Sequence, residues 1–341
     1  MADRCYLDWN ATAPLRQEAR DAMLAAMDLC GNPSSVHGEG RAAKACVEQA
    51  RGQVAALIGV APSEIIFTSG ATEAAKTIAA AFGPIQAEET EHDCVFAHRG
   101  DAADDATAKI RAISAANSET GILRDPAPGA GLLLRDAVQA LGKTAYCHDG
   151  DIVLASAHKI GGPKGIGAIA LRPGLDLAPL LTGGGQEMGR RSGTENVIGI
   201  AGFGAAATAA MRDLEGGAWD RVKELRTILE CELDRIAPNA ILMGAGAARL
   251  PNTTCVATPG WKGETQVMQM DLAGFAISAG SACSSGKVKE SRVLRAMGHD
   301  AEIASSAIRI SLGPTTTEDE ILEFARAWEG AFRRFQARRD K

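Results

Sequence analysis

The sequence predicts an α/β protein in which a mostly parallel sheet lies between helices, followed by a smaller α+β unit. Two observations lead to this fold class. Short apolar runs of strand length, such as residues 65–67 and 152–155, alternate with segments of helical spacing, which is typical of a parallel sheet covered on both faces. Gly216 and Gly217 then interrupt the helical pattern, and beyond them residues 307–312 alternate between apolar and polar positions. We therefore expect a domain boundary near residues 214–218.

Composition excludes several classes of protein. The chain has 341 residues, enough for one large and one smaller domain, and its 46% hydrophobic and 23% charged residues are typical of a globular protein. A net charge of −6, with no basic run before the C-terminal tail, argues against direct binding of nucleic acid. No apolar run has the length of a membrane span, and the N-terminus lacks the apolar stretch of a signal peptide.

The 8 cysteines form no CxxC pair and no Cys/His spacing typical of zinc, so no metal site is predicted. We expect them to be reduced and mostly buried, as in a cytoplasmic protein. Cys283 differs, because it lies among small and polar residues where its chemistry matters more than its packing. The alternative is an exposed cysteine without a role.

Residues 64–75 predict a strand, a tight glycine turn and a helix that begins at Ala71. Such a turn presents backbone N–H groups to an anion, and the helix dipole favours negative charge there. Thr72, in the first helical turn, has a hydroxyl that adds a donor. Many αβ units contain such a turn, so on its own it is a weak indication of phosphate binding.

The stretch most informative about chemistry is residues 151–167, a buried-strand pattern that ends in a glycine-rich turn. Ser156, His158 and Lys159 lie where the strand becomes the turn. Burial lowers the pKa of a lysine, and its neutral amine can then form a Schiff base with a carbonyl. The alternative is that Lys159 is a surface-loop lysine.

Residues 131–136 predict another strand, which ends in Asp136 and is followed by Gln139. A carboxylate beyond the carboxyl end of a buried strand lies where α/β folds bind ligands. An acid and a lysine therefore follow successive strands. His92 lies at the mouth of a further short apolar run, and Asn117 in a polar turn; alone, each has an ordinary structural explanation.

Two segments of the chain's second half leave alternatives open. Residues 180–196 form a glycine-rich loop with two arginines, suited to a linker or to a subunit contact. Arg309 is the central polar residue of the strand predicted at 307–312. It either faces solvent or a local carboxylate, or its guanidinium binds the carboxylate of a substrate.

Together these stretches resemble the cysteine desulfurases, pyridoxal-phosphate enzymes of the class V aminotransferase group. The resemblance implies a fold type I enzyme with a seven-stranded type of sheet. It also implies a large cofactor-binding domain at 13–214 and a small domain formed by 1–12 and 215–341. The cysteine motif is similar to that of the branch that supplies sulfur for Fe–S cluster assembly. The matching stretches, in the family's order and across nearly the whole chain, are YLDWNAT, GNPSSVHGEGR, IIFTSGATEA, TEHD, NSETG, the Asp136/Gln139 pair, SAHKIGGPKGIG, GGGQEMGRRSGTEN, AGSACSS and SSAIRISLG.

The resemblance implies three catalytic residues. Lys159 would carry pyridoxal 5'-phosphate as a Schiff base and later move the α-proton of L-cysteine. His92 would stack on the cofactor ring and assist proton transfer. Cys283 would take the substrate's sulfur as a persulfide while alanine is released.

It also implies binding residues. Asp136 would keep the pyridine nitrogen protonated, and Gln139 with Asn117 would lie near the phenolic oxygen. The substrate carboxylate would be held by Arg309 and Asn10, with help from Asn117. The phosphate would be held by Thr72, Ser156, His158, the backbone at Ala71 and, across a homodimer, Thr194 of the neighbouring subunit.

Three hypotheses about function follow. The first is a cysteine desulfurase that passes sulfur to an acceptor protein, such as an Fe–S scaffold, a nitrogenase-cluster system or a tRNA-thiolation relay. The second is a relative with the same cofactor: a selenocysteine lyase, a cysteine sulfinate desulfinase or a plain aminotransferase. The third is a non-catalytic sulfur-relay scaffold. Residues 93–116 and 122–135 are shorter than is usual in the family, which leaves the number of strands open.

Overall fold

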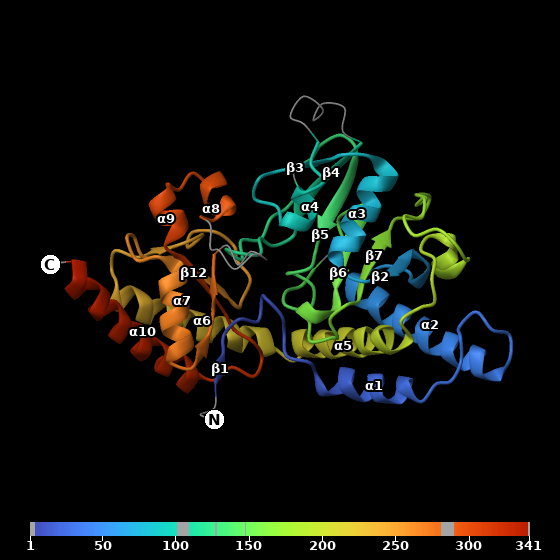
Figure 1. Cartoon of the computed structure of the whole chain (residues 1–341), viewed down its shortest axis with the longest axis horizontal. Helices are drawn as coiled ribbons and strands as arrows, with labels where there is room; N and C mark the ends of the chain where they lie inside the picture. The colour runs from blue at the N-terminus through green and yellow to red at the C-terminus, as the bar shows by residue number, and fades with distance from the viewer. Residues whose placement is uncertain (1–3, 101–108, 127, 147, 281–289, 340–341) are drawn as a thin grey trace. The chain divides into compact units, whose positions relative to one another are not determined.

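The computed structural model describes residues 4–100, 109–126, 128–146, 148–280 and 290–339 (Figure 1). By their contacts the residues form two compact units. The sheet unit comprises Thr12–Ala116 and Arg124–Gly216, and the C-terminal unit comprises Met1–Ala11, Asn117–Leu123 and Gly217–Lys341.

Asn117–Leu123 belongs to the C-terminal unit although it lies inside the predicted 13–214 domain. Backbone hydrogen bonds explain this placement. Leu123 N–H donates to the Ala248 carbonyl at 2.9 Å, and Leu250 N–H donates to the Gly121 carbonyl at 2.8 Å. A seven-residue excursion of the chain therefore contributes backbone to the other unit.

The sheet unit is built on a mixed sheet with the strand order β2-β7-β6-β5-β4-β3. Strands β3 to β6 run parallel, and β7 runs antiparallel to both β2 and β6. The predicted α/β class with a mostly parallel sheet is confirmed. The strands are β2 (Ile65–Thr68), β3 (Ile85–Ala87), β4 (Ile110–Ser114), β5 (Leu132–Asp136), β6 (Ile152–Ser156) and β7 (Gly167–Leu171).

The expected seventh strand is not found among the described residues, in which this sheet has six strands. The chain passes from β3 through the short helix α4 (Asp93–Phe96) to β4. A further parallel strand would need its own crossover connection of about a dozen residues. The described residues of the segment 93–116 form α4 and β4.

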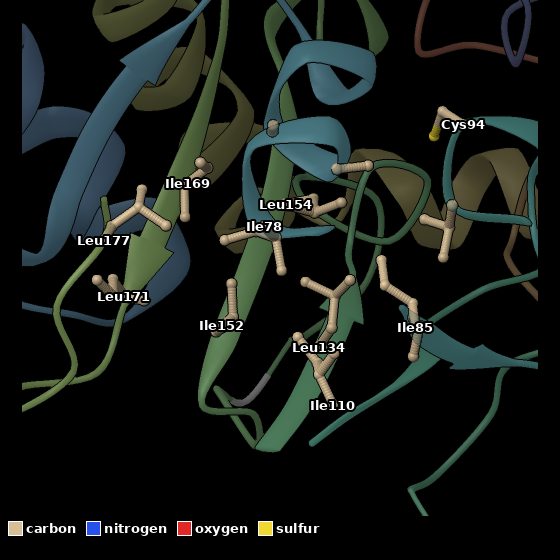
Figure 2. Close-up of a cluster of buried hydrophobic side chains, with 14 of the residues drawn as sticks. Ile78, Ile85, Cys94, Ile110, Leu134, Ile152, Leu154, Ile169, Leu171 and Leu177 are labelled. Carbon is tan, nitrogen blue, oxygen red and sulfur yellow. The ribbon is translucent and has the colours of Figure 1, made fainter. Parts of the chain in front are cut away.

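Helices cover both faces of this sheet. Alternate strand residues, among them Ile110, Leu134, Ile152 and Ile169, meet Ile78 of α3 (Ala71–Phe82) in one buried cluster (Figure 2). On the opposite face Phe67 meets Phe203 of α5 with ring centroids 6.4 Å apart. Here α5 (Val197–Glu215) packs with α1 (Gln17–Met27) and α2 (Gly38–Ile58) (Figure 1). Because both faces are buried, the strands are continuous apolar runs in the sequence.

Among the described residues α5 is also the helix that is long and apolar enough to cross a membrane. Ten of its residues are buried inside the sheet unit, so α5 is a core helix. Its apolar character therefore reflects packing against α1, α2 and the sheet.

The C-terminal unit contains a four-stranded antiparallel sheet with the order β11-β12-β9-β8, and β1 pairs in parallel with β10. The predicted strand at 307–312 is confirmed as β12, a central strand. Thr317 and Glu320 form a capping box before the last helix, since the N–H of Thr317 donates to Glu320 Oε2 at 2.8 Å and the N–H of Glu320 donates to Thr317 Oγ1 at 3.3 Å. The elements are β1 (Cys5–Tyr6), α6 (Ala218–Ile236), β8 (Ile241–Leu242), β9 (Thr253–Ala257), α7 (Gly263–Leu272), β10 (Phe275–Ala276), β11 (Ser278–Ala279), α8 (Arg292–Ala296), α9 (Ala301–Ser305), β12 (Ala307–Ser311) and α10 (Glu318–Arg339).

The cysteines are less buried than expected. All six that the structure describes are free thiols, but only Cys5, Cys94 and Cys255 are buried, whereas Cys30 and Cys231 are exposed. The buried thiols lie in or beside the cores of their units, and desolvation raises the pKa of Cys5 to about 12. These three are packing residues rather than reactive ones.

Candidate active site

The carboxyl ends of β2 and β6 meet across the start of β7. Thr68 of β2 and Ser156 of β6 both pair with Gly167. A Cβ atom on Gly167 would lie 2.7 Å from the Cα of Gly70, so only glycine allows the turn after β2 to approach this closely. The turn that was predicted to bind phosphate therefore lies beside the strand that precedes Lys159.

The β2–α3 turn has the features of an anion site. Helix α3 begins at Ala71, and its N-cap, Gly70, provides no side chain to satisfy the first N–H groups. Thr72 is in that first turn. An anion bound there would accept from backbone N–H groups and gain from the helix dipole.

Helix η3 (Ala157–Lys159) follows β6 directly and places His158 and Lys159 at the carboxyl edge of the sheet. Both side chains are half-buried, and Ser156 is buried. Burial, with the nearby charge of Lys159, lowers the pKa of His158 to about 4, so its imidazole is neutral at pH 7. His158 Nδ1 lies 3.2 Å from Thr12 Oγ1. A neutral imidazole keeps one N–H to donate to a phosphate.

Asp136 is the last residue of β5 and pairs in register with Leu154 of β6. It is buried, and its Oδ1 accepts the Val138 N–H at 3.0 Å. Burial raises the pKa of the Asp136 carboxyl, whereas the positive charges of His92 and Lys159 oppose that rise. The structure thus brings together three residues that were singled out from the sequence.

His92 is exposed and is the N-cap of α4, where its Nδ1 accepts the Cys94 N–H at 3.2 Å. The residue before it, Glu91, is fully buried and was missed in the sequence. Both Glu91 carboxylate oxygens accept the Ser114 N–H at 3.0 Å, and Oε1 accepts from Arg124 Nη1 at 2.9 Å. Glu91 therefore fixes the His92 segment to the end of β4.

Gln139 lies in the turn after β5 and is buried. Its Oε1 accepts a hydrogen bond of 2.6 Å from Nζ of Lys143, which is also buried. Lys143 was missed as well. The signal that could have found it is its spacing, since residues i and i+4 of a helical turn share a face.

The loop at 180–196 is held by a buried ion pair between Glu187 and Arg51. Arg51 Nη1 and Nη2 donate to the Glu187 carboxylate at 2.7 and 2.9 Å, and the N–H of Phe67 donates to it at 2.9 Å. Glu187 and Met188 have positive φ angles of 49° and 59°, which are costly for residues other than glycine. Thr194, further along this loop, is exposed.

Arg309 in the C-terminal unit is 6% exposed although it was expected on a polar strand face. Its Nη2 donates to Asp8 Oδ1 and its Nη1 to the Ser118 carbonyl, both at 2.9 Å. The alternative of a local carboxylate is thus confirmed for one end of the guanidinium. The buried Nε has no hydrogen-bond partner among the described residues, so the fork keeps a donor for a ligand.

Two asparagines lie in the same unit and are buried. Asn10 Nδ2 donates to Thr253 Oγ1 at 2.8 Å, and its Oδ1 accepts from Asn252 at 3.0 Å. Asn117 Oδ1 accepts the Glu119 N–H at 3.0 Å, which closes its own turn. A contact from Asn117 to a ligand would therefore come from its amide nitrogen.

Cys283 lies outside the described residues. The described residues on the two sides of Cys283 are anchored by backbone hydrogen bonds. Before it, the N–H of Gly280 donates to the Ala307 carbonyl at 3.1 Å. After it, the N–H of Ser291 donates to the Ala304 carbonyl at 3.2 Å. Both flanks of the cysteine motif are therefore bonded within the C-terminal unit.

The donor set of the sheet unit fits pyridoxal phosphate. The anion-binding turn with Ser156 and neutral His158 suits the phosphate, Lys159 suits the aldehyde carbon, and the buried carboxyl of Asp136 suits a protonated ring nitrogen. The mixed sheet with these groups at its carboxyl edge defines a pyridoxal-phosphate enzyme of fold type I.

Comparisons with known proteins narrow this class. The aminotransferase class-V family matches residues 5–124 and 101–324. A cysteine desulfurase of Cereibacter sphaeroides is 42% identical, with 94% of this chain and 93% of the relative covered. The cysteine desulfurase IscS of Dictyoglomus turgidum is 34% identical, with 94% and 92% covered. The chain belongs to the cysteine desulfurase family, pyridoxal-phosphate-dependent enzymes of the class-V aminotransferases.

Solved structures of similar proteins have the same fold. A NifS-like protein has a TM-score of 0.85 at 32% identity, with 96% of this chain and 99% of that chain covered. A NifS-like protein from Rickettsia africae has the same TM-score at 30% identity, with the same coverage. The fold is therefore that of these NifS-like proteins.

Proposed function

We propose that the protein removes the sulfur atom of L-cysteine, releases L-alanine and holds the sulfur as a persulfide on Cys283. The observation that carries this proposal is the cluster of Asp136, His92 and Lys159 at the carboxyl edge of the sheet, in a chain 42% identical to a cysteine desulfurase. Bound pyridoxal phosphate would supply an electron-accepting ring that stabilises negative charge at the substrate's α-carbon.

The chain's own residues would hold the reactants and move protons. The Lys159 amine would carry the cofactor and then transfer the α-proton. Asp136 would accept a hydrogen bond from the ring nitrogen, and this ion pair would keep that nitrogen charged. Arg309 would bind the substrate carboxylate through its fork, assisted by Asn10 and Asn117. Asp8 holds the Arg309 guanidinium in position for this role.

Cys283 would accept the sulfur. Its thiolate forms the new S–S bond while the carbon–sulfur bond of cysteine breaks, and the bonding electrons pass to the β-carbon, which gains a proton. The products are a persulfide and alanine, so no external oxidant or reductant is needed. A cytoplasmic acceptor protein, such as an Fe–S scaffold, would then receive the sulfur.

The functional protein would be a homodimer. Several large apolar side chains of the sheet unit are exposed in the single chain, and Thr194 is exposed as a contact to a neighbour's phosphate requires. The exposed apolar residues are Leu15, Leu24, Met27, Val36, Leu180, Leu181 and Met188. Sedimentation velocity tests this assembly: Leu24→Glu with Met188→Glu should weaken the dimer, whereas Leu272→Glu, an exposed leucine of the C-terminal unit, should not.

The central experiment measures alanine and sulfide formed from L-cysteine. Cys283→Ala should abolish both products while the visible absorption of the bound cofactor persists. Cys231→Ala removes an exposed free thiol and serves as the matched control, with activity retained. Mass spectrometry of Cys283 after cysteine treatment should find one added sulfur atom.

The same assays separate the alternatives. A plain aminotransferase or a sulfinate desulfinase would be unaffected by Cys283→Ala, and a selenocysteine lyase would act on selenocysteine in preference to cysteine. A sulfur-relay scaffold would show no cofactor absorption even with added pyridoxal phosphate. Any of these results would overturn the proposed function.

A further inference from the structure

Lys143 is a buried cation with no part in the chemistry proposed above. It is 2% exposed, and its Nζ donates to Gln139 Oε1 at 2.6 Å. Burying an ammonium is costly unless it is hydrogen-bonded, so the position of this lysine needs an explanation. Its charge also helps to lower the pKa of His158, which places it close to the proposed phosphate site.

The backbone holds Lys143 in place. Residues 137–144 form consecutive hydrogen-bonded turns, in which Lys143 N–H donates to the Ala140 carbonyl at 3.1 Å. Gly142 has a φ of +69°, and a Cβ there would lie 2.8 Å from the Cβ of Ala210 in α5. The segment is thus packed tightly on the core helix, and its four-residue spacing aims Lys143 at Gln139.

The chemistry of the two groups fixes an orientation. An ammonium has donors only, whereas the two ends of a glutamine amide are nearly equal in size and are chosen by their partners. With Lys143 on Oε1, the amide must present its Nε2 donors to the other side. A glutamine held in this way turns its N–H donors, rather than its carbonyl oxygen, toward a ligand on that side.

We infer that Lys143 is a positioning residue that makes Gln139 a hydrogen-bond donor to the phenolic oxygen of the cofactor. This inference rests on the proposed cofactor site. A donor to that oxygen favours the deprotonated form of the bound chromophore. Without Lys143 the amide can turn its carbonyl toward the oxygen, so the pH midpoint of the visible absorption rises by about one unit, the shift that one hydrogen bond to an ionised group produces.

The test is a pH titration of the visible absorption of the holoenzyme. Lys143→Met and Gln139→Leu should each raise the midpoint, and the double variant should not raise it beyond Gln139→Leu alone, because Lys143 acts through Gln139. Lys143→Arg keeps a donor and should restore the wild-type midpoint. Lys76→Met, which removes an exposed lysine of α3, is the matched control and should cause no shift.

Two outcomes overturn the inference: an unchanged midpoint in Lys143→Met, or a shift that adds fully to that of Gln139→Leu. If Lys143→Met does not fold, Lys143→Gln replaces it, and its midpoint should lie between those of the wild type and Gln139→Leu. The titration needs no turnover of cysteine, so its failure is distinct from failure of the proposed function. Loss of thermal stability without a spectral shift would show a packing role alone.

Discussion

Two buried charged residues, Asp136 in the sheet unit and Arg309 in the C-terminal unit, are compensated in different ways. Asp136 ends a strand, and burial raises the pKa of its carboxyl against the influence of His92 and Lys159. Arg309 lies in the middle of a strand and already has a fixed carboxylate, Asp8, at 2.9 Å. The acid therefore has a charge that depends on its neighbours, whereas the arginine is charged under all conditions.

This difference follows from the positions of the two residues in their sheets. The carboxyl edge of a parallel sheet gathers the ends of several strands, so groups from β5, η3 and α4 act on one carboxyl. A residue in the middle of an antiparallel strand contacts the segments that lie beside that strand in space. For Arg309 these contacts are with Asp8 and Ser118. The sheet unit thus suits chemistry that changes charge, and the C-terminal unit suits recognition of a fixed charge.

The largest effect is expected for Lys159→Ala, which tests the proposed cofactor site of the sheet unit. In the proposed mechanism, loss of the amine would remove both cofactor attachment and proton transfer, so alanine formation should fall by about 10⁴-fold. Borohydride reduction followed by mass spectrometry should find the cofactor on Lys159 in the wild type only. Lys164→Ala removes an exposed neighbouring lysine and should leave both readouts unchanged.

The next effect in size is expected for Asp136→Asn. The amide is isosteric but cannot stabilise a charged ring nitrogen, so kcat should fall by about 10²- to 10³-fold with the cofactor still bound. Asp149→Asn is the control, because Asp149 is a partly exposed carboxylate that pairs with Arg135 at 2.9 Å and has no role in the proposed chemistry. Full activity in Asp136→Asn would show that the charge of the Asp136 carboxyl does not matter for catalysis, and would contradict the contrast drawn with Arg309.

On the substrate side, Arg309→Lys keeps the charge but loses the fork. Charge-assisted hydrogen bonds contribute about 1.5 to 3 kcal/mol, so kcat/KM for cysteine should fall about 10- to 100-fold with cofactor affinity unchanged. Arg249→Lys removes a second buried fork, paired with Glu230 at 2.8 Å, and should lower stability rather than kcat/KM. Equal kinetic effects of both variants would contradict a substrate role for Arg309.

The last prediction leaves activity aside and concerns the pH dependence of stability in the cofactor-free protein. Burial raises the pKa of Glu91 from 4.5 to about 7, so the native state binds its proton more tightly. Its contribution is fully present below pH 4.5 and is lost as pH rises to about 7, at up to about 1.4 kcal/mol per pH unit. Glu91→Gln should remove this loss, measured as the difference between urea midpoints of variant and wild type.

His158 provides an internal check on that result. The pKa of His158 is lowered from 6.5 to about 4, so its contribution has the opposite sign and rises with pH over nearly the same range. In the wild type the two slopes offset each other. Glu91→Gln should therefore gain stability as pH rises from about 4.5 to 6.5, and the same profile in both proteins would show that Glu91 does not titrate there.

The parts of the site that local pattern encodes could be predicted from the sequence. The strand-turn-helix at 65–71, Asp136 at a strand end and Lys159 in a glycine-rich turn each depend on neighbours a few residues away. Their partners could not be predicted, because Arg51 and Glu187 are 136 residues apart and Asp8 and Arg309 are 301 apart. No short-range pattern distinguishes such a pair from surface charges.

Burial explains two further differences. Arg309 and Lys143 lie on segments whose spacing is compatible with a solvated face, and only their packing shows that both are enclosed. Among the described residues the large sheet has six strands rather than the seven that the resemblance implied. Residues 117–123 crossed the predicted boundary because their backbone bonds, rather than their side chains, assign them to a unit.

Gly167 sets how closely the β2–α3 turn, the proposed phosphate site, approaches β6. One hydrogen atom in place of a methyl group lets two loops from distant parts of the chain touch, since any β-carbon would lie 2.7 Å from Gly70. An alanine at this position would widen the gap by pushing the helix start away from Ser156. Tolerance to mutation here should thus be lower than at Thr72, although Gly167 would never contact the ligand.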